Sequence, residues 1–256
     1  MSVDWFKHFF RGTPDGYVFP IWSLTHFAML AIAFIGVEFI ILNKEKLKES
    51  PKGKIFKYLM IIVLALQQII LYLWYGFSGY FTIHESLPLY NCRIAIIFTI
   101  IALITDKKLF RNVSCYWGVA GAILALMMPT DLDPFSFPHY TNIGFFLGHI
   151  GLLWATIYIL IVDGYRIDKK SLKSIIYFTN TYHLLIYILN IVTNSNYCYL
   201  NKAPIARTFF ENNMSPMIYS LTAFFAFNVF MILVYFTAKT IYRILGIDEE
   251  EWAKSY

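Results

Sequence analysis

The sequence predicts an all-α, polytopic membrane bundle of about seven transmembrane helices. The composition is the first reason, because 58% of the 256 residues are hydrophobic and only 14% are charged. Soluble domains average roughly 25% charged residues. The second reason is a series of continuous apolar runs of the length that a helix needs to cross a hydrocarbon core of roughly 30 Å. These runs leave no room for a separate soluble domain, so residues 1–256 are predicted to form a single integral membrane domain.

The predicted spans follow one another along the chain with short polar breaks. They cover approximately residues 19–42, 56–77, 87–105, 113–129, 141–163, 173–194 and 215–245. The last run is too long for one crossing, so we expect it to leave the membrane near Lys239. Residues 1–17, which place aromatic side chains beside Lys7 and Arg11, fit a short interfacial segment. Residues 246–256 are predicted to be a short cytoplasmic tail.

The third reason is that positive charge occurs in every second polar break. The breaks at 43–57, 106–111 and 164–173 are rich in Lys and Arg, whereas those at 76–91 and 129–142 contain none. Because Lys and Arg resist translocation, the basic breaks are predicted to be cytoplasmic. The N-terminus is then outside and the C-terminus inside a multi-pass protein of the cell membrane. The net charge of +5 is explained by topology and by contact with anionic lipids, so a nucleic-acid partner is not expected.

Polar side chains inside the predicted spans gather in the half that faces outside. Such groups cost several kcal/mol in hydrocarbon, which makes them candidate site residues. Cys92 and Arg93 lie in the outer part of the third span, and His149 lies about two turns into the fifth. His26 has a similar depth in the first span, and His183 lies near the middle of the sixth. The other polar candidates are Gln67, Gln68, Asn91, Asn190, Asn194, Asn196 and Tyr197.

Cys92 and His149 are the residues that we expect to carry chemistry. A thiolate attacks acyl carbons well, and a neighbouring imidazole can take the thiol proton and later return it. Arg93 would favour the thiolate or hold a lipid phosphate. If Asn91 is the N-cap of the third span, Cys92 is the first helical residue, where free backbone donors favour a thiolate and an oxyanion. If Ser86 is the cap, Cys92 lies one turn deeper.

Each of these candidates also has a purely structural interpretation. A single Cys in a membrane helix is most often a small packing residue. His149 stands between glycines, which is typical of close helix packing with the imidazole bonded to a neighbour's carbonyl. His26 and His183 fit structural roles better than catalytic ones. A disulfide between Cys92 and Cys198 would abolish a nucleophile role.

The remaining polar features do not indicate a metal site. No CxxC pair and no Cys/His spacing typical of zinc occurs in the sequence. Asp131 and Asp133 lie between Pro129 and Pro134, which predicts turn and capping roles. We therefore expect no metal and no cofactor.

Several short motifs occur in an order that resembles the YwaF-like integral membrane proteins. They are Leu87-Pro88-Leu89-Tyr90-Asn91-Cys92-Arg93, Met128-Pro129-Thr130-Asp131, Phe137-Pro138-His139-Tyr140, His149, and Asn196-Tyr197 with Leu200, Lys202 and Pro204. The similarity runs from about residue 20 to 235. Many bacterial members have His in place of Tyr90, and the family's Lys–Pro pair is interrupted here by Ala203. A mammalian relative in this superfamily is a cysteine-dependent acyltransferase that builds ether phospholipids, so the resemblance implies a nucleophilic Cys92 with His149 as its partner.

Two classes of function follow from these observations. The first is a membrane acyltransferase or lipid hydrolase that acts on phospholipid acyl chains through a Cys thioester. The second is a non-catalytic protein that binds or transports a lipid or small molecule, although the prolines at span ends disfavour the unwound helices of transporters. In either case membrane phospholipids are the expected partners. Spans 87–105, 141–163 and 173–194 would line an outward-facing pocket, with substrate-binding residues Arg93, Asn91, Asn196, Tyr197, His26 and His183.

Overall fold

The computed structural model describes residues 3–130 and 132–244, and every regular element in these ranges is helical. The helices are α1 (Val3–Phe9), α2 (Leu24–Leu42), α3 (Lys44–Glu49), α4 (Pro51–Ser78), α5 (Asn91–Thr105), α6 (Lys108–Val113), α7 (Val119–Met127), α8 (Tyr140–Ile161), α9 (Lys169–Thr193), α10 (Arg207–Asn213) and α11 (Pro216–Ile244). A π-helical turn, Ser114–Gly118, joins α6 to α7. Asp131 and the predicted tail at 246–256 lie outside the described residues.

The described part of the chain contains six helices that are long and apolar enough to cross a membrane. They are α2, α4, the continuous stretch Lys108–Met127, α8, α9 and α11. This confirms a multi-pass, all-helical membrane protein. The predicted third span is shorter than expected, because α5 starts only at Asn91, after Pro88, and has 15 residues. At 1.5 Å per residue it is about 22 Å long, so seven crossings remain a prediction.

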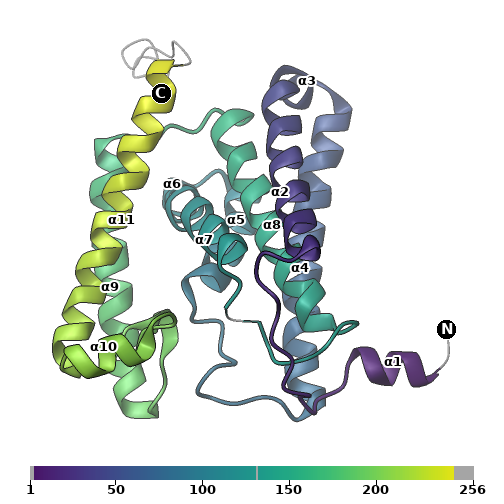
Figure 1. Cartoon of the computed structure of the whole chain (residues 1–256). Helices are drawn as coiled ribbons and strands as arrows, with labels where there is room; N and C mark the ends of the chain where they lie inside the picture. Colours follow the sequence, from purple (N-terminus) through teal and green to yellow (C-terminus); the bar gives the residue numbers. More distant parts are fainter. Residues whose placement is uncertain (1–2, 131, 245–256) are drawn as a thin grey trace.

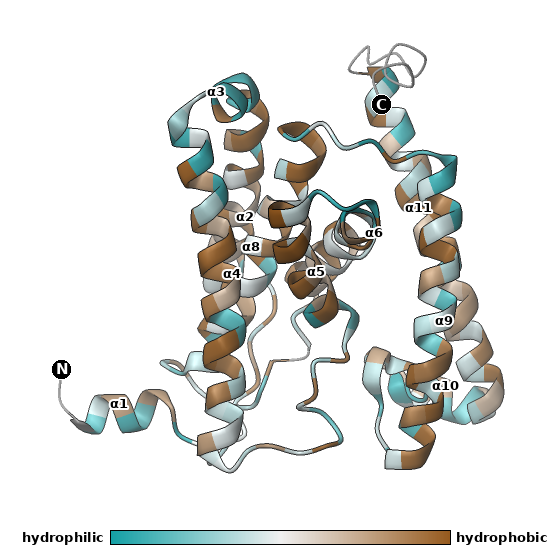
Figure 2. Cartoon of the chain, turned by 180° about the vertical axis from the view of Figure 1, so that it is seen from behind, coloured by the Kyte–Doolittle hydropathy of each residue, from teal (hydrophilic) through white to brown (hydrophobic). Residues whose placement is uncertain are grey.

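Figure 1 shows α2, α4, α8, α9 and α11 standing roughly side by side, with α1 extending outward from one end of the bundle. The first and last described residues lie at opposite ends. Of the six long helices, α8 has the largest buried share, and it packs against α2, α4 and α7. Helices α9 and α11 form a pair at one side (Figure 1). Figure 2 shows apolar residues along most of the long helices and hydrophilic residues gathered at α3 and in the connecting loops.

Small residues allow α4 and α8 to approach closely. A Cβ added at Gly148 would lie 3.2 Å from the side-chain carbon Cδ of Gln67, and one at Gly151 would lie 3.0 Å from Leu64 Cδ2. The close packing expected around His149 from its glycine neighbours is therefore confirmed. It brings the polar Gln67 and Gln68 of α4 next to the helix that carries His149.

Ion pairs join three helices at one end of the bundle. Lys57 of α4 and Arg111 of α6 both pair with Asp163, which follows α8, at 3.4 and 3.7 Å. Arg111 also pairs with Asp106. We call this end, which contains the basic breaks at 43–57, 106–111 and 164–173, the lysine end. The other end, which contains the start of α5, the start of α8 and residues 128–139, is called the cysteine end.

Candidate functional site

A small cavity of about 80 Å³ lies at the cysteine end, between α4, α5, α8 and the loop at 128–139. Both Cys92 and His149 line it. Its other lining residues are Gln67, Gln68, Leu71, Tyr75, Arg93, Ile96, Leu132, Asp133, Thr141, Gly144, Phe145 and Gly148. The structure thus places the expected nucleophile and base at one cavity, although they are separated by 57 positions in the sequence.

Cys92 is the second residue of α5. Tyr90, rather than Asn91, occupies the N-cap position, and its side chain makes no capping hydrogen bond. Cys92 still belongs to the first turn, where backbone N–H groups have no carbonyl partner within the helix. Those donors and the positive end of the helix dipole favour negative charge at this position. The expected location of Cys92 near a helix N-terminus is therefore correct, although the cap is a different residue.

His149 is half-buried in α8 and bonds to its own helix. Its Nδ1 lies 2.8 Å from the backbone oxygen of Phe145. A carbonyl oxygen only accepts, so Nδ1 carries the proton and Nε2 of the neutral ring has the lone pair. Nε2 makes no hydrogen bond with any residue that the structure describes. The sequence predicted a hydrogen bond from His149 to a neighbouring helix, but the bond lies within α8. This bond leaves Nε2 unprotonated, as a general base requires.

Arg93 organises the chain segment that leads into α5. Its Nη1 donates to the backbone oxygens of Glu85, Ser86 and Leu87, at 3.1–3.3 Å. Its Nη2 donates to the hydroxyl of Tyr75 at 2.8 Å. Both terminal nitrogens thus have protein partners. The guanidinium adds positive charge beside the cavity, and its contacts fit a positioning role better than capture of a lipid phosphate.

Asp133 is a cavity residue that the sequence pattern assigned only to a turn. Burial raises the pKa of its carboxyl to about 6, while the positive charge of Arg93 opposes this shift and Glu85 adds to it. The neighbouring prolines predict the turn, but no pattern in the sequence shows that the turn points this side chain into the cavity. The cavity lining thus contains a carboxyl group in addition to Cys92, His149 and Arg93.

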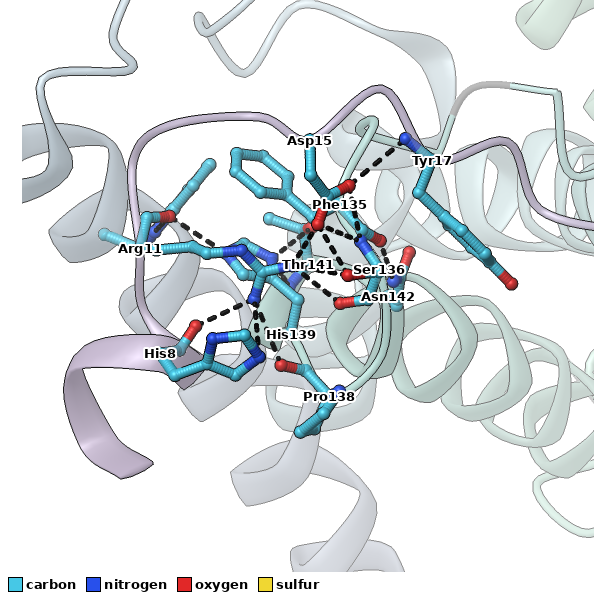
Figure 3. A network of polar contacts seen from close by, with 11 residues as sticks. His8, Arg11, Asp15, Tyr17, Phe135, Ser136, Pro138, His139, Thr141 and Asn142 are labelled. Carbon is cyan, nitrogen blue, oxygen red and sulfur yellow. Dashed lines mark hydrogen bonds and ion pairs between the residues drawn. The ribbon is translucent and has the colours of Figure 1, made fainter. Parts of the chain in front are cut away.

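The N-terminal segment holds the loop that carries Asp133 (Figure 3). The carboxylate of Asp15 accepts hydrogen bonds from the backbone N–H and the hydroxyl of Ser136, at 2.9 and 2.5 Å, and pairs with Arg11 at 2.7 Å. These bonds hold the pKa of the Asp15 carboxyl well below its usual range, and the hydrogen bond from the Ser136 hydroxyl contributes most to this shift. Arg11 Nη2 also donates to the backbone oxygen of Ser136 at 2.8 Å. We call this arrangement the N-terminal latch.

His139, at the N-cap of α8, completes the N-terminal latch. Its ring stacks on Phe135 with centroids 3.9 Å apart. Nδ1 accepts from the backbone N–H of Thr141, and Nε2 donates to the backbone oxygen of Arg11 at 3.0 Å. Burial lowers the pKa of His139 to about 4, which agrees with the neutral ring that these two bonds require. The cavity wall at 132–141 is therefore attached to both α8 and the N-terminal segment.

A family model named the TMEM164 family matches residues 21–236, which is most of the sequence. The chain belongs to the TMEM164 family. No curated protein and no solved structure matches it. The resemblance to YwaF-like proteins covers nearly the same stretch, and the acyltransferase activity that it implies remains an expectation for this TMEM164-family chain.

The two other candidate histidines of this TMEM164-family protein, His26 and His183, do not line the cavity. His26 is fully buried, its Nδ1 accepts from Trp22 N at 3.0 Å, and its Nε2 donates to the backbone oxygen of Leu126 at 2.7 Å. His183 is also fully buried and lies within 3.1–3.2 Å of the Asn91 amide. These contacts join α2 to α7 and α9 to α5. They fit structural roles, the interpretation that the sequence favoured for both histidines.

Asn196 and Tyr197 lie outside the cavity lining as well. The Asn196 side chain bonds to both the backbone N–H and the backbone oxygen of Lys202, at 3.0 and 2.9 Å. The Tyr197 hydroxyl accepts from Leu87 N and donates to Ile83 O. Helix α9 contributes no lining residue that the structure describes, and α4 takes its place. The predicted lining by span 173–194 is therefore wrong, because α9 pairs with α11 at the side of the bundle.

The cysteines of this TMEM164-family chain are all thiols. Cys198 donates to the backbone oxygen of Leu89 at 3.1 Å. Burial raises the pKa of its thiol above the usual range. A disulfide between Cys92 and Cys198 is absent from the described residues.

Proposed function

We propose that this TMEM164-family membrane protein is an acyltransferase that acts on phospholipid acyl chains in the cell membrane, with Cys92 as nucleophile and His149 as base. The observation that carries the proposal is the shared cavity, which Cys92 lines from α5 and His149 from α8. The tautomer of His149 adds support, because its hydrogen bond to Phe145 leaves Nε2 as the acceptor. No metal or soluble cofactor is required.

The first half of the reaction transfers the acyl group to sulfur. Nε2 of His149 takes the proton of the Cys92 thiol, and the thiolate attacks the carbonyl carbon of the ester. The carbon–oxygen bond to the glycerol then breaks, and His149 returns the proton to the leaving lyso-lipid oxygen. The N–H groups of the first turn of α5 have no carbonyl partner within the helix, which makes them suitable donors to the oxyanion that forms during this step.

The second half releases the acyl group. An acceptor hydroxyl or amine loses its proton to His149 as it attacks the thioester, and the thiol of Cys92 is regenerated. Attack by water in the same place would instead give hydrolysis. The cavity of about 80 Å³ is smaller than the roughly 300–1,000 Å³ of common ligand pockets. We therefore expect only the reacting ester to enter it, with the acyl chain left among the lipids.

Formation of the thioester can be tested directly. The purified protein would be treated with an activated acyl ester such as p-nitrophenyl octanoate and followed by intact-protein mass spectrometry. We expect one added octanoyl group on Cys92, lost in Cys92→Ala and greatly reduced in His149→Ala, because the two groups act as a unit. Cys115→Ala is the matched control and should be acylated normally, since Cys115 belongs to the π-helical turn and does not line the cavity.

Two results would contradict this proposal. One is a Cys92 that reacts with small thiol reagents but never takes up an acyl group. The other is equal acylation of the wild type and of Cys92→Ala. Either result would favour a protein that binds lipids without transforming them.

A further inference from the structure

We propose that a second cavity, at the cysteine end of α9 and α11, binds a single-chain phospholipid. Its volume is about 390 Å³, and it shares no lining residue with the Cys92 cavity. Residues of α9, the loop after it, α10 and α11 form its walls. The span ends that enclose it lie at the depth of lipid headgroups, where polar and apolar groups meet. The site therefore suits a ligand that has both a charged head and an apolar chain.

The charge of this second cavity selects an anionic head. The acidic residue of its lining, Glu211, pairs with Arg207 at 2.8 Å. Lys202 also lines the cavity and forms no ion pair within the described residues. Its backbone is fixed on both sides by the Asn196 side chain. A fixed backbone and an unpaired ammonium group match a phosphate, which accepts charge-assisted hydrogen bonds.

A buried acceptor next to Lys202 requires a donor. The side-chain nitrogen of Asn201 donates to the backbone oxygen of Ser195 at 3.2 Å. Its side-chain oxygen is buried and has no hydrogen-bond partner in the described structure. Buried acceptors in native proteins are nearly always satisfied. A lysophospholipid has a free glycerol hydroxyl two bonds away from the carbon that carries the phosphate ester, so it supplies the donor that a diacyl glycerol backbone lacks.

Apolar and aromatic side chains form the rest of the second cavity. Tyr187 and Ile191 contribute from α9, and Phe210, Met214 and Tyr219 from α10, the residue after it and α11. Ile191 is 61% exposed in the described structure, so an acyl chain that leaves the cavity can continue along the lipid-facing side of α9. The volume falls within the range of common ligand pockets. Inorganic phosphate alone would leave this apolar surface unused.

The test uses the full chain in phosphatidylcholine nanodiscs and a lysophosphatidylglycerol whose acyl chain carries a photoreactive diazirine. We expect crosslinks in peptides that cover residues 187–220, and competition by unlabelled lysophosphatidylglycerol. Lys202→Gln should weaken binding about tenfold, the value of one charge-assisted hydrogen bond. Lys54→Gln, which changes an exposed lysine at the lysine end, should bind like the wild type. Lys202→Arg should retain binding, which separates loss of the cation from loss of the fold.

Several outcomes would overturn this proposal. Crosslinks confined to α4, α5 and α8 would place the lipid elsewhere. Equal competition by monoacylglycerol would show that the phosphate is not recognised, and equal competition by inorganic phosphate would show that the chain is not. The proposal does not depend on thioester chemistry, so Cys92→Ala should bind the probe like the wild type. A loss of binding in that variant would mean that the lipid occupies the Cys92 cavity instead.

Discussion

A Cβ atom added at Gly121 of α7 would lie 3.0 Å from the sulfur of Cys92. Contacts this short are rare between real side chains, so the thiol can hold its position only because residue 121 has no side chain. Helix α7 therefore forms the back of the nucleophile's site without appearing among the residues that line the cavity. This relationship connects the predicted fourth span to the chemistry proposed for the third and fifth.

The substitution Gly121→Ala is predicted to displace the Cys92 thiol and slow its acylation. A shift of about 1 Å in a reacting group can cost roughly 100-fold in rate, so we expect a loss between tenfold and 100-fold. Gly76→Ala is the matched control, because a Cβ there would meet nothing within 4 Å. The rate of octanoyl transfer to Cys92 and the thermal unfolding temperature would be measured for both. Unchanged acylation in folded Gly121→Ala would show that the thiol has room to move.

Arg93→Lys is predicted to lower stability although it keeps the positive charge. A lysine ammonium cannot reach three carbonyl groups and the Tyr75 hydroxyl with the planar geometry of a guanidinium. Lost hydrogen bonds to a charged group are worth about 1–3 kcal/mol each, so a clearly lower unfolding temperature in detergent is expected. If Arg93→Lys unfolds like the wild type but loses affinity for phospholipid, Arg93 holds a phosphate rather than the segment at 85–87.

Acyl transfer is predicted to fall as pH drops through about 6, because the Asp133 carboxyl then becomes neutral. The raised pKa of about 6 means that the carboxylate form is complete only above this value. We expect that form, which lines the same cavity as His149, to stabilise the imidazolium that arises during thiol deprotonation. A stabilisation of one pK unit corresponds to roughly tenfold in rate. The profile of kcat/KM against pH for the wild type should show this limb, and Asp133→Asn should lack it. A limb that persists in Asp133→Asn would assign the ionisation to another group.

The orientation in the membrane is predicted to place the cysteine end outside the cell. His84 and Glu49 are exposed residues in breaks of opposite predicted side. Each would be changed to Cys in a chain whose native cysteines are replaced by Ala. A membrane-impermeant maleimide should label the His84→Cys variant in intact cells, and the Glu49→Cys variant only after lysis. The reverse pattern would invert the topology.

Much of the fold could be predicted from the sequence, because a helix can cross the hydrocarbon core only where the chain has a sufficiently long apolar run. The predicted runs at 141–163 and 173–194 agree with α8 and α9 to within a few residues. The run at 215–245 likewise agrees with α11, which continues unbroken to Ile244, and its exit from the membrane near Lys239 stays a prediction. The distribution of Lys and Arg among the polar breaks indicates which helix ends lie together. The ion pairs of Asp163 with Lys57 and Arg111 occur at the lysine end.

The site was only partly predictable, because depth in the membrane does not say which face of a helix points inward. That Cys92 and His149 lie at the same end of the bundle followed from their places in the runs. The contributions of Asp133 and Gly121 depend on how the loop at 128–139 and helix α7 pack, which no local pattern records. The position of Asn196 and Tyr197 outside the lining of the Cys92 cavity could not be predicted for the same reason. Their polar groups hold loops beside α9, and α9 turns toward α11.

The N-terminal latch has a consequence for the order in which the protein can be completed. Arg11 and Asp15 emerge from the ribosome before their partner Ser136, which lies 121 positions after Asp15. Domains generally fold from the N-terminal side during synthesis, yet this segment must wait until several later helices have been inserted. The wall of the Cys92 cavity is thus completed by a contact between an early and a late part of the nascent chain. A truncated translation product that ends before residue 136 would lack this contact, and so a chain arrested midway would carry its cysteine without a finished site.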